Sequence, residues 1–380
     1  MNKKIDILIE VSPAINSNKS GVGYYVDGLV RSFSKYNNIY GYYFNFFNKN
    51  KIITSYKIKL YAIKLIPSKV ISIFKLVGKL PYIEIFVQKK FDFILYTNYI
   101  SLPILRKTRY GLVVYDLGFI DCPEYIQEKN LQYLKKFCPD SIKQADLILT
   151  ISQFTKNRIE QNFPTTKGKI IVTYIPPVNK PVTFTQTNTK DVVFNTSKYI
   201  LFVGSIEPRK NIENLVKAYL NLPVPMRKEY SLILAGGKGW KDESLLRLIE
   251  YNQRMGENII TTGYISDQHK DKLYRSASLF VLPSHYEGFG MPVLEAMQYN
   301  IPIALSDIPV FKEIAGDSVN YFNKDSVNDI AKVIEKTLTS EVLKPNQENI
   351  YTNILAKYSW KDNVKIVTKA IDKCLMEVKD

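Results

Sequence analysis

Short apolar runs alternate with longer amphipathic stretches along most of the chain. Each short run predicts a buried strand, and each stretch with apolar residues three or four positions apart predicts a helix. Because the two kinds alternate, the pattern predicts an α/β fold with parallel sheets. The predicted strands are 5–9, 38–47, 93–96, 110–115, 145–150, 170–175, 199–203, 230–235, 259–262, 279–282 and 301–305. The predicted helices are 24–33, 51–79 with a break at Pro67, 128–144 with a break at Pro139, 271–275, 292–300, 326–337 and 360–378.

The most informative stretch is 281–316, a strand, a glycine turn, a helix and a second strand. Gly288 and Gly290 allow a ligand to approach the backbone closely, and a helix start favours a phosphate group. Glu287, on the turn, and Glu295, expected in the first helical turn, can accept hydrogen bonds from sugar hydroxyls. Together these features indicate a sugar joined to a diphosphate. The alternative is that the glycines only shape the turn and the glutamates only complement the helix dipole.

Two other loops carry candidate chemistry. After strand 199–203 comes Gly204-Ser-Ile-Glu-Pro-Arg209-Lys210-Asn211, which places a guanidinium fork and an ammonium group before a helix, as a phosphate site requires. After strand 5–9, the loop 16–23 opens a βα unit of the mononucleotide-binding type. Neither the dinucleotide fingerprint nor a P-loop occurs in the chain. The alternative for the first loop is that Arg209 and Lys210 are ordinary basic residues on the surface. The alternative for the loop 16–23 is a tight turn that binds nothing.

Size and composition limit the class of protein. A chain of 380 residues predicts two domains, with the border at Pro176-Pro177. No apolar stretch is long enough to span a membrane, and the basic N-terminus reads as a first strand rather than a signal peptide. Three scattered cysteines indicate a reducing cytoplasm. There is no D-x-D sequence, and the two histidines, His269 and His285, belong to no ligand cluster, so no metal site is expected.

The net charge of +16 predicts an anionic partner. The basic segment 51–90 contains nine lysines and one acid, Glu84, interleaved with apolar and aromatic residues. Such a segment can lie on an anionic membrane surface, although a solvated basic face is the alternative. The chain has no recognised nucleic-acid-binding module, so nucleic acid is not the expected partner.

The motifs resemble those of one family. The string E-G-F-G-M-P-V-L-E-A-M at 287–297 closely resembles the E-x7-E signature of retaining glycosyltransferases of the family-four type. The strings at 204–211 and 145–156 also fit the family, and the resemblance is strongest over 201–317. It implies the GT-B fold, two Rossmann-like domains whose parallel sheets face each other across a cleft. Residues 1–177 would be the acceptor domain, 178–360 the nucleotide-sugar donor domain, and the helix 361–380 would pack back on the first domain.

The resemblance also implies roles for individual residues. The catalytic set would be Glu287, Arg209 and Lys210, with no cofactor beyond the nucleotide-diphosphate sugar itself and no metal. The donor would be bound by Gly288, Phe289, Gly290, Met291, Glu295, Gly204, Gly236, Gly237, Tyr264 and Ile265. The acceptor side of the cleft would hold Gly21, Gly23, Tyr115 and Asp116. Tyr115 is a departure, because relatives often have histidine there, and a phenol with a pKa of about 10 is a poor base near neutrality.

The expected activity follows from the resemblance. The sequences at 236–240 and 286–290 resemble those of bacterial mannosyltransferases of surface polysaccharide and O-antigen synthesis. The resemblance therefore implies transfer of mannose from GDP-mannose to a lipid-linked saccharide, by a cytoplasmic protein bound peripherally to the inner face of the cell membrane. Other donors, namely dTDP-rhamnose, UDP-hexoses and UDP-N-acetylhexosamines, stay open. So do a non-catalytic GT-B partner subunit and a basic nucleic-acid-binding protein. The linkage position and the oligomeric state are not readable from the sequence.

Overall fold

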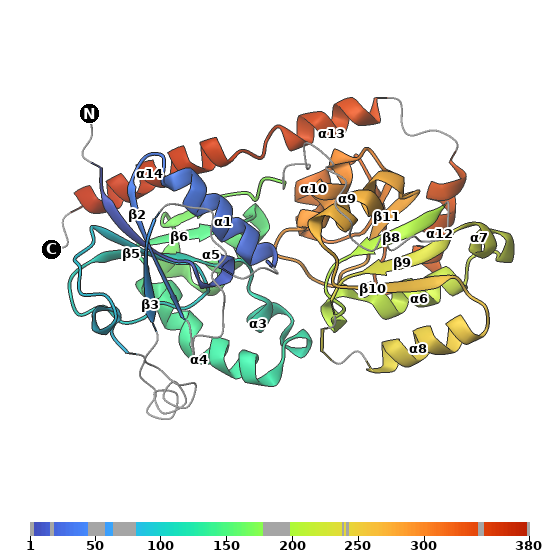
Figure 1. The fold of residues 1–380 in the computed structure, drawn as a ribbon, viewed down its shortest axis with the longest axis horizontal. Helices are drawn as coiled ribbons and strands as arrows, with labels where there is room; N and C mark the ends of the chain where they lie inside the picture. Colours follow the sequence, from blue (N-terminus) through green and yellow to red (C-terminus); the bar gives the residue numbers. More distant parts are fainter. Residues whose placement is uncertain are drawn as a thin grey trace. The chain divides into compact units, whose positions relative to one another are not determined.

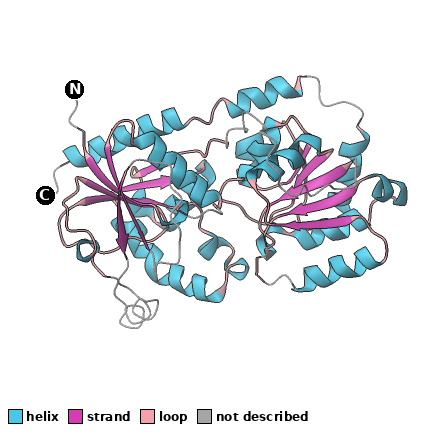
Figure 2. Cartoon of the chain, viewed as in Figure 1, coloured by secondary structure: helices cyan, strands magenta, loops and turns pink. Residues whose placement is uncertain are grey.

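The computed structural model describes residues 4–15, 19–44, 58–63, 81–177, 198–237, 239–240, 243–340 and 346–377. The chain divides into two compact units, one formed by Met1–Ile175 with Ser359–Asp380 and the other by Pro176–Tyr358. Each unit is built on one parallel sheet with helices on both faces (Figures 1 and 2). No helix among the described residues is both long and apolar enough to cross a membrane.

The first unit contains, within its described residues, a seven-stranded sheet in the order β3-β2-β1-β4-β5-β6-β7. Every strand pair is parallel, and the register aligns Ile9 of β1 with Leu95 of β4. The strands are β1 (Asp6–Glu10), β2 (Asn38–Phe44), β3 (Lys59–Ile63), β4 (Phe93–Tyr96), β5 (Arg109–Val113), β6 (Leu147–Thr150) and β7 (Ile170–Val172). The helices are α1 (Gly21–Phe33), α3 (Gly118–Asp121), α4 (Glu128–Gln144), α5 (Gln153–Asn162) and α14 (Trp360–Met376).

The second unit repeats this arrangement with a six-stranded sheet among its described residues, in the order β10-β9-β8-β11-β12-β13. The strands are β8 (Tyr199–Val203), β9 (Ser231–Ala235), β10 (Ile259–Gly263), β11 (Leu279–Leu282), β12 (Ile303–Ser306) and β13 (Asn320–Phe322). The helices are α6 (Ile212–Leu220), α7 (Val224–Glu229), α8 (Glu243–Arg254), α9 (Asp267–Ser276), α10 (Met291–Gln298), α11 (Pro309–Ala315), α12 (Val327–Thr339) and α13 (Gln347–Leu355).

The local sequence explains most of these elements. The central strands β4, β8 and β11 are buried along their whole length, because helices cover both faces of the sheet. Several helices begin where a serine side chain accepts a hydrogen bond from the N–H three residues later, which stabilises the first turn. These N-caps are Ser20, Ser152, Ser266, Ser326 and Ser359.

Two expectations about helices were wrong. Helix α4 runs unbroken through Pro139. Proline removes one helical hydrogen bond, but Leu131, Cys138 and Ile142 are buried on one side of α4, and this packing holds both halves in line. The predicted helix 51–79 is a strand at Lys59–Ile63, which pairs in parallel with β2 at the edge of the sheet. Residues 51–57 and 64–79 of that predicted helix, including Pro67, lie outside the described residues, as do 45–47 of the predicted second strand.

Helix α14 packs on α1 through a close approach of backbone and ring in the first unit (Figure 1). A Cβ atom added to Gly28 of α1 would lie 2.1 Å from Cζ2 of Trp360. The Trp360 ring also lies 5.7 Å from the ring of Tyr25. Glycine at position 28 is therefore what allows the indole to lie against α1.

We predict that Gly28→Ala destabilises the protein by about 1–3 kcal/mol, because the added methyl group overpacks against the indole ring. Urea denaturation at neutral pH measures this loss. The matched control is the same substitution in a Trp360→Leu background, where the cost of Gly28→Ala should nearly vanish. An equal cost in both backgrounds would show that the indole is not what constrains residue 28.

Candidate functional site

The order of the second sheet places two of the loops singled out from the sequence side by side. The strand order reverses between β8 and β11, which are adjacent in the sheet. Ligands of open parallel sheets bind at such a reversal, outside the carboxyl ends of the strands. The loop after β8 is 204–211, and the loop after β11 is 283–290. The cationic doublet and the first glutamate of the E-x7-E motif therefore converge on the same place in the fold.

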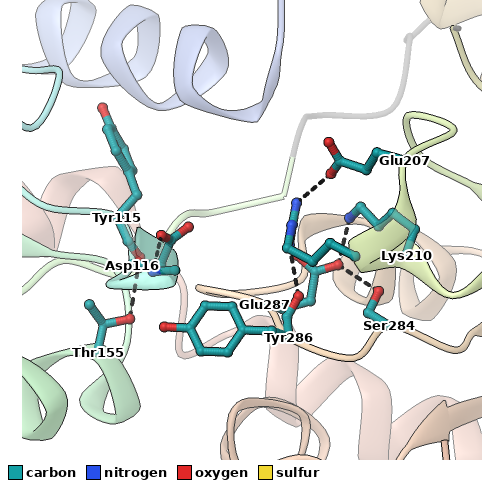
Figure 3. A network of polar contacts seen from close by, with 10 residues as sticks. Tyr115, Asp116, Thr155, Glu207, Lys210, Ser284, Tyr286 and Glu287 are labelled. Carbon is teal, nitrogen blue, oxygen red and sulfur yellow. Dashed lines mark hydrogen bonds and ion pairs between the residues drawn. The ribbon is translucent and has the colours of Figure 1, made fainter. Parts of the chain in front are cut away.

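Glu287 is the centre of a polar network there (Figure 3). Its Oε2 accepts a hydrogen bond from Arg209 Nη1 at 2.7 Å, and its Oε1 accepts one from Lys210 Nζ at 2.5 Å. Ser284 Oγ donates to Oε1 at 2.7 Å. Both carboxylate oxygens are thus held by charged or polar donors, which keeps the Glu287 side chain in one orientation.

Electrostatics keeps this carboxyl group ionised. Glu287 is 7% exposed, and burial by itself would raise its pKa. The charges of Arg209 and Lys210, with hydrogen bonds from Lys210 and Ser284, outweigh burial and lower the pKa to about 2. Glu287 is therefore an anion throughout the neutral range, and it is a weak base.

Arg209 connects three parts of the two loops. Besides Glu287, its Nη1 donates to the backbone oxygen of Tyr286 at 2.8 Å, and its Nη2 donates to Glu207 Oε1 at 2.7 Å. The backbone of the loops is joined as well, because His285 N donates to Arg209 O at 2.9 Å. The guanidinium group is consequently fixed in position by partners on both sides of the strand reversal.

Asn211, the last residue of the P-R-K-N string, ties the loops together without carrying charge. It adopts a left-handed backbone conformation, with φ of 57°, and it is buried. Its Nδ2 donates to Pro283 O at 3.0 Å and to Lys324 O at 2.8 Å. Asparagine tolerates this backbone better than most residues, and its amide satisfies two loop carbonyls at once.

Glu295 is held by a different pair of residues. It is the fifth residue of α10, beyond the first turn in which we expected it. Lys270 Nζ donates to its Oε1 at 2.8 Å, and Tyr274 OH donates to its Oε2 at 3.0 Å. Burial would lower the pKa of Lys270, but Glu295 and Asp267 raise it, so the ammonium group stays charged. The Tyr274 ring stacks on Tyr299 at 5.4 Å, which supports it from behind.

The glycine turns of the second unit allow close backbone contacts. A Cβ atom on Gly236 would lie 1.7 Å from the backbone oxygen of Gly204, so the loops after β8 and β9 touch. Gly290 has a φ of 126°, a conformation that side-chain-bearing residues avoid. It is the N-cap position of α10, where no side chain makes a capping hydrogen bond. Phe289 is buried between Gly288 and Met291, with its ring against Tyr358, so its side chain belongs to the packing of the second unit.

The expected base-pocket residues lie after β10. Tyr264 is 56% exposed and Ile265 is half-buried. A Cβ atom on Gly237 would lie 3.8 Å from that of Tyr264, so these two turns are neighbours. A ring packed in the core would be buried, whereas the Tyr264 ring is exposed and therefore accessible for stacking.

The acceptor-side candidates belong to the first unit. Gly21 and Gly23 form the first turn of α1, and a Cβ atom on Gly23 would lie 2.6 Å from the backbone oxygen of Pro13. Tyr115 is buried, and its hydroxyl donates to Thr97 O at 2.8 Å, so the phenol is engaged inside the unit. Burial raises the pKa of Tyr115 further. Asp116 is half-buried and accepts a hydrogen bond from Gly118 N at 2.9 Å (Figure 3).

Sequence reasoning missed four residues that hold these groups, Ser284, Glu207, Lys270 and Tyr274. Lys270 and Tyr274 are four positions apart, so they share one face of α9, and this spacing was a usable signal. Their target, Glu295, is remote in sequence, and only the fold brings them together. Within the described residues, no group of three or more His, Cys, Asp or Glu side chains is placed to hold a metal ion.

The chain is similar to known glycosyltransferases. The family "Glycosyl transferases group 1" matches residues 184–356. The O-antigen chain mannosyltransferase B of Escherichia coli is 33% identical over 240 residues, which are 62% of this chain and 63% of that protein. The match thus spans somewhat less than two thirds of that relative. The O-antigen chain mannosyltransferase RfbU of Salmonella typhimurium (strain LT2) is 30% identical over 270 residues, 71% of this chain and 70% of that protein.

The fold has close counterparts among solved structures. The structure of WaaG, a glycosyltransferase involved in lipopolysaccharide biosynthesis, superposes with a TM-score of 0.68 at 14% identity, covering 98% of this chain and all of that one (100%). Two parallel α/β units of this kind, with the paired glutamates and the cationic doublet in the second, define a protein of the GT-B class. The chain belongs to the group 1 glycosyltransferases, the family-four type that its E-x7-E motif resembles.

The ion cluster makes a prediction about stability. The pKa of Glu287 is lowered from 4.5 to about 2, so its ionised form stabilises the folded state. This contribution, about 3 kcal/mol, is complete above pH 4.5 and is lost as the pH falls towards 2. We predict that Glu287→Gln loses about 2–3 kcal/mol of unfolding free energy at pH 7. At pH 4 the difference in unfolding free energy between this variant and the wild type should be smaller.

Urea denaturation of both proteins at the two pH values measures this difference. Glu213→Gln is the control, because Glu213 forms an exposed i,i+4 pair with Lys217 and should change stability by about 0.5 kcal/mol or less. A pH-independent loss in Glu287→Gln would mean that packing, and not the ion cluster, makes Glu287 important.

Proposed function

We propose that this chain is a retaining glycosyltransferase that moves mannose from GDP-mannose to a lipid-linked saccharide in O-antigen or related surface polysaccharide synthesis. The observation that carries the proposal is the convergence of Arg209, Lys210 and Glu287 at the strand reversal of the second sheet. A diphosphate and a sugar need neighbouring cationic and carboxylate groups, and this loop pair supplies both. Similarity to two O-antigen chain mannosyltransferases supports mannose as the transferred sugar and O-antigen synthesis as the pathway class.

In the proposed reaction, the bond between the sugar anomeric carbon and the diphosphate oxygen breaks, and its electron pair leaves with the diphosphate. The acceptor hydroxyl oxygen forms the new bond on the same face, and its proton passes to the departing phosphate oxygen. Arg209 and Lys210 offset the charge that develops on the leaving group. The uncapped start of α10 adds the positive end of a helix dipole. This supply of positive charge by the protein itself supports a metal-independent mechanism.

Glu287 has a positioning role in this proposal. With a pKa of about 2, it does not take a proton near neutrality, but it accepts hydrogen bonds from sugar hydroxyls well. It also fixes the two cations that face the diphosphate. Glu207 occupies one edge of the Arg209 guanidinium group, and a bound diphosphate would compete with it for that edge. Glu295 would accept hydrogen bonds from the ribose hydroxyls in the same way.

Peripheral membrane attachment through the segment 51–90 is part of the proposal, since a lipid-linked acceptor lies in a membrane. Most of that segment lies outside the described residues. In the described part, Lys59 lies 5.4 Å from the centre of the Tyr61 ring on edge strand β3. Lys89 lies 3.7 Å from the centre of the Tyr40 ring but also pairs with Asp6 at 2.8 Å. Its charge is therefore partly balanced within the first unit.

A panel of nucleotide sugars tests the activity directly. We predict that GDP-mannose is turned over faster than dTDP-rhamnose, UDP-hexoses and UDP-N-acetylhexosamines, with membrane extract as the acceptor source.

We also predict that Arg209→Ala lowers kcat at least about 100-fold, because one group that stabilises the leaving diphosphate is lost. Release of nucleotide diphosphate and transfer of labelled sugar are the measurements.

The control for Arg209→Ala is Lys217→Ala, which removes an exposed cation from α6, the helix that follows the same loop. This variant should keep wild-type turnover. Circular dichroism must show that Arg209→Ala stays folded. Wild-type turnover in Arg209→Ala, or preference for another donor in the panel, would refute the corresponding part of the proposal.

Membrane attachment has its own test. We predict that replacing Lys51, Lys57, Lys64, Lys69, Lys75 and Lys79 with Gln lowers co-sedimentation with phosphatidylglycerol vesicles at least tenfold, because each lysine near an anionic surface contributes about 1 kcal/mol. The control replaces six exposed lysines elsewhere: Lys217, Lys228, Lys332, Lys336, Lys357 and Lys373. An equal loss in both variants would mean that overall charge, rather than this segment, attracts the protein to membranes.

A further inference from the structure

The first sheet has a strand reversal that matches the one in the second sheet. It lies between β1 and β4, which are paired in register at Ile9 and Leu95. Glu10 is the last residue of β1, and Thr97 comes directly after β4. The carboxyl ends of these two strands therefore border the position where a parallel sheet of this kind receives a ligand. In the second unit, the equivalent position holds Glu287 and its two cations.

Glu10 is built into this position. Thr97 N donates to Glu10 Oε2 at 3.2 Å, and Thr97 Oγ1 donates to the backbone oxygen of Glu10 at 2.8 Å. Tyr115 OH donates to the backbone oxygen of Thr97 at 2.8 Å. The ends of β1 and β4 and the segment after β5 are thus joined by hydrogen bonds. Oε2 is engaged by this network, and within the described residues Oε1 accepts no hydrogen bond.

The charge environment of Glu10 is opposite to that of Glu287. No Lys, Arg or His of the described residues forms an ion pair with Glu10. The titratable groups whose pKa its charge helps to raise are phenols from β2, from β4, from the segment after β5 and from α4, namely Tyr42, Tyr96, Tyr115 and Tyr133. These phenols are neutral near pH 7, so Glu10 is an isolated carboxyl group among them.

Burial of a carboxyl group without a counter-charge is unfavourable, and among the described residues only the Thr97 hydrogen bond opposes this cost for Glu10. Glu10 is 5% exposed, and burial raises its pKa to about 7, against a smaller opposing effect of the Thr97 N–H. A simple strand-joining role would be met by an uncharged glutamine without this cost. The lack of a counter-charge in the part of the chain that the structure describes also makes the position unfavourable for a phosphate. A neutral hydroxyl group is the ligand that such a carboxylate binds well.

We propose that Glu10 is an acceptor-binding residue, whose Oε1 accepts a hydrogen bond from a hydroxyl group of the acceptor saccharide at the strand reversal of the first sheet. This inference rests on the proposed glycosyl transfer. It gives the first unit a recognition group of its own. It also moves the expected acceptor contact away from Tyr115, whose hydroxyl is engaged with Thr97 O inside the unit.

The test is steady-state kinetics with octyl glycosides of mannose, galactose, glucose and N-acetylglucosamine as acceptor probes. Glu10→Gln keeps the side-chain volume and an oxygen for the Thr97 N–H, but it removes the charge. We expect its acceptor KM to rise about tenfold, while the donor KM changes less than twofold. The wild-type kcat/KM for the acceptor should rise as the pH increases through about 7, since the ionised carboxylate accepts more strongly, and Glu10→Gln should lose this rise.

The matched control is Asp6→Asn, the same chemical change at the opposite end of β1, where the carboxylate pairs with Lys89. It should leave the acceptor KM and the pH profile unchanged. If Glu10→Gln folds poorly, Glu10→Asp, which keeps the charge but withdraws it by one methylene, should also raise the acceptor KM. An unchanged acceptor KM and an unchanged pH profile in the Glu10 variants overturn the inference, whereas absence of transfer in the wild type overturns the proposed function instead.

Discussion

The buried ion cluster of Glu287, Arg209 and Lys210 is the interaction on which the candidate site depends. A carboxylate removed from water is costly unless it is paired and hydrogen-bonded, and here both of its oxygens have charged partners. The cluster bridges the loops after β8 and β11, so its formation fixes the geometry of both. Cations fixed beside a carboxylate suit a ligand in which an anionic diphosphate is joined to a sugar: the cations can bind the diphosphate, and the carboxylate can accept hydrogen bonds from the sugar hydroxyls.

The scaffold explains why this cluster can form. Both units place a strand reversal at the centre of a parallel sheet, and in both units the loops that follow the two central strands meet there. The second unit fills this position with balanced charges, whereas the first fills it with Glu10, whose charged neighbours among the described residues include no cation paired with it and whose titratable neighbours are phenols. The same architecture thus holds two chemically different buried carboxyl groups, and we propose that one serves a diphosphate sugar and the other an uncharged hydroxyl ligand. The proposed donor and acceptor roles of the two units follow from this difference.

The supporting residues show how much of the site is positioned indirectly. Asn211 donates hydrogen bonds to the loop carbonyls of Pro283 and Lys324, and Tyr274 holds Glu295 while its ring stacks on Tyr299. The net charge of the chain was a weaker guide to its binding partner. Lys89, one of the lysines that suggested a membrane surface, is paired with Asp6. A net charge describes the long-range field of a protein, whereas local pairing decides which cations remain available to a partner.

The sequence by itself determined the α/β class, the order of most strands and helices, and the loops that carry Arg209, Lys210, Glu287 and Glu295. These follow from local periodicity and from motifs short enough to read along the chain. Only the tertiary structure decided that Lys59–Ile63 is an edge strand, that α4 continues through Pro139, and that Ser284, Lys270 and Tyr274 hold the two glutamates. Each of these outcomes depends on partners remote in sequence, because pairing with β2, burial against a sheet and side-chain hydrogen bonds are properties of the folded chain. For the same reason the engaged hydroxyl of Tyr115 and the isolation of Glu10 could not be read from the residues alone.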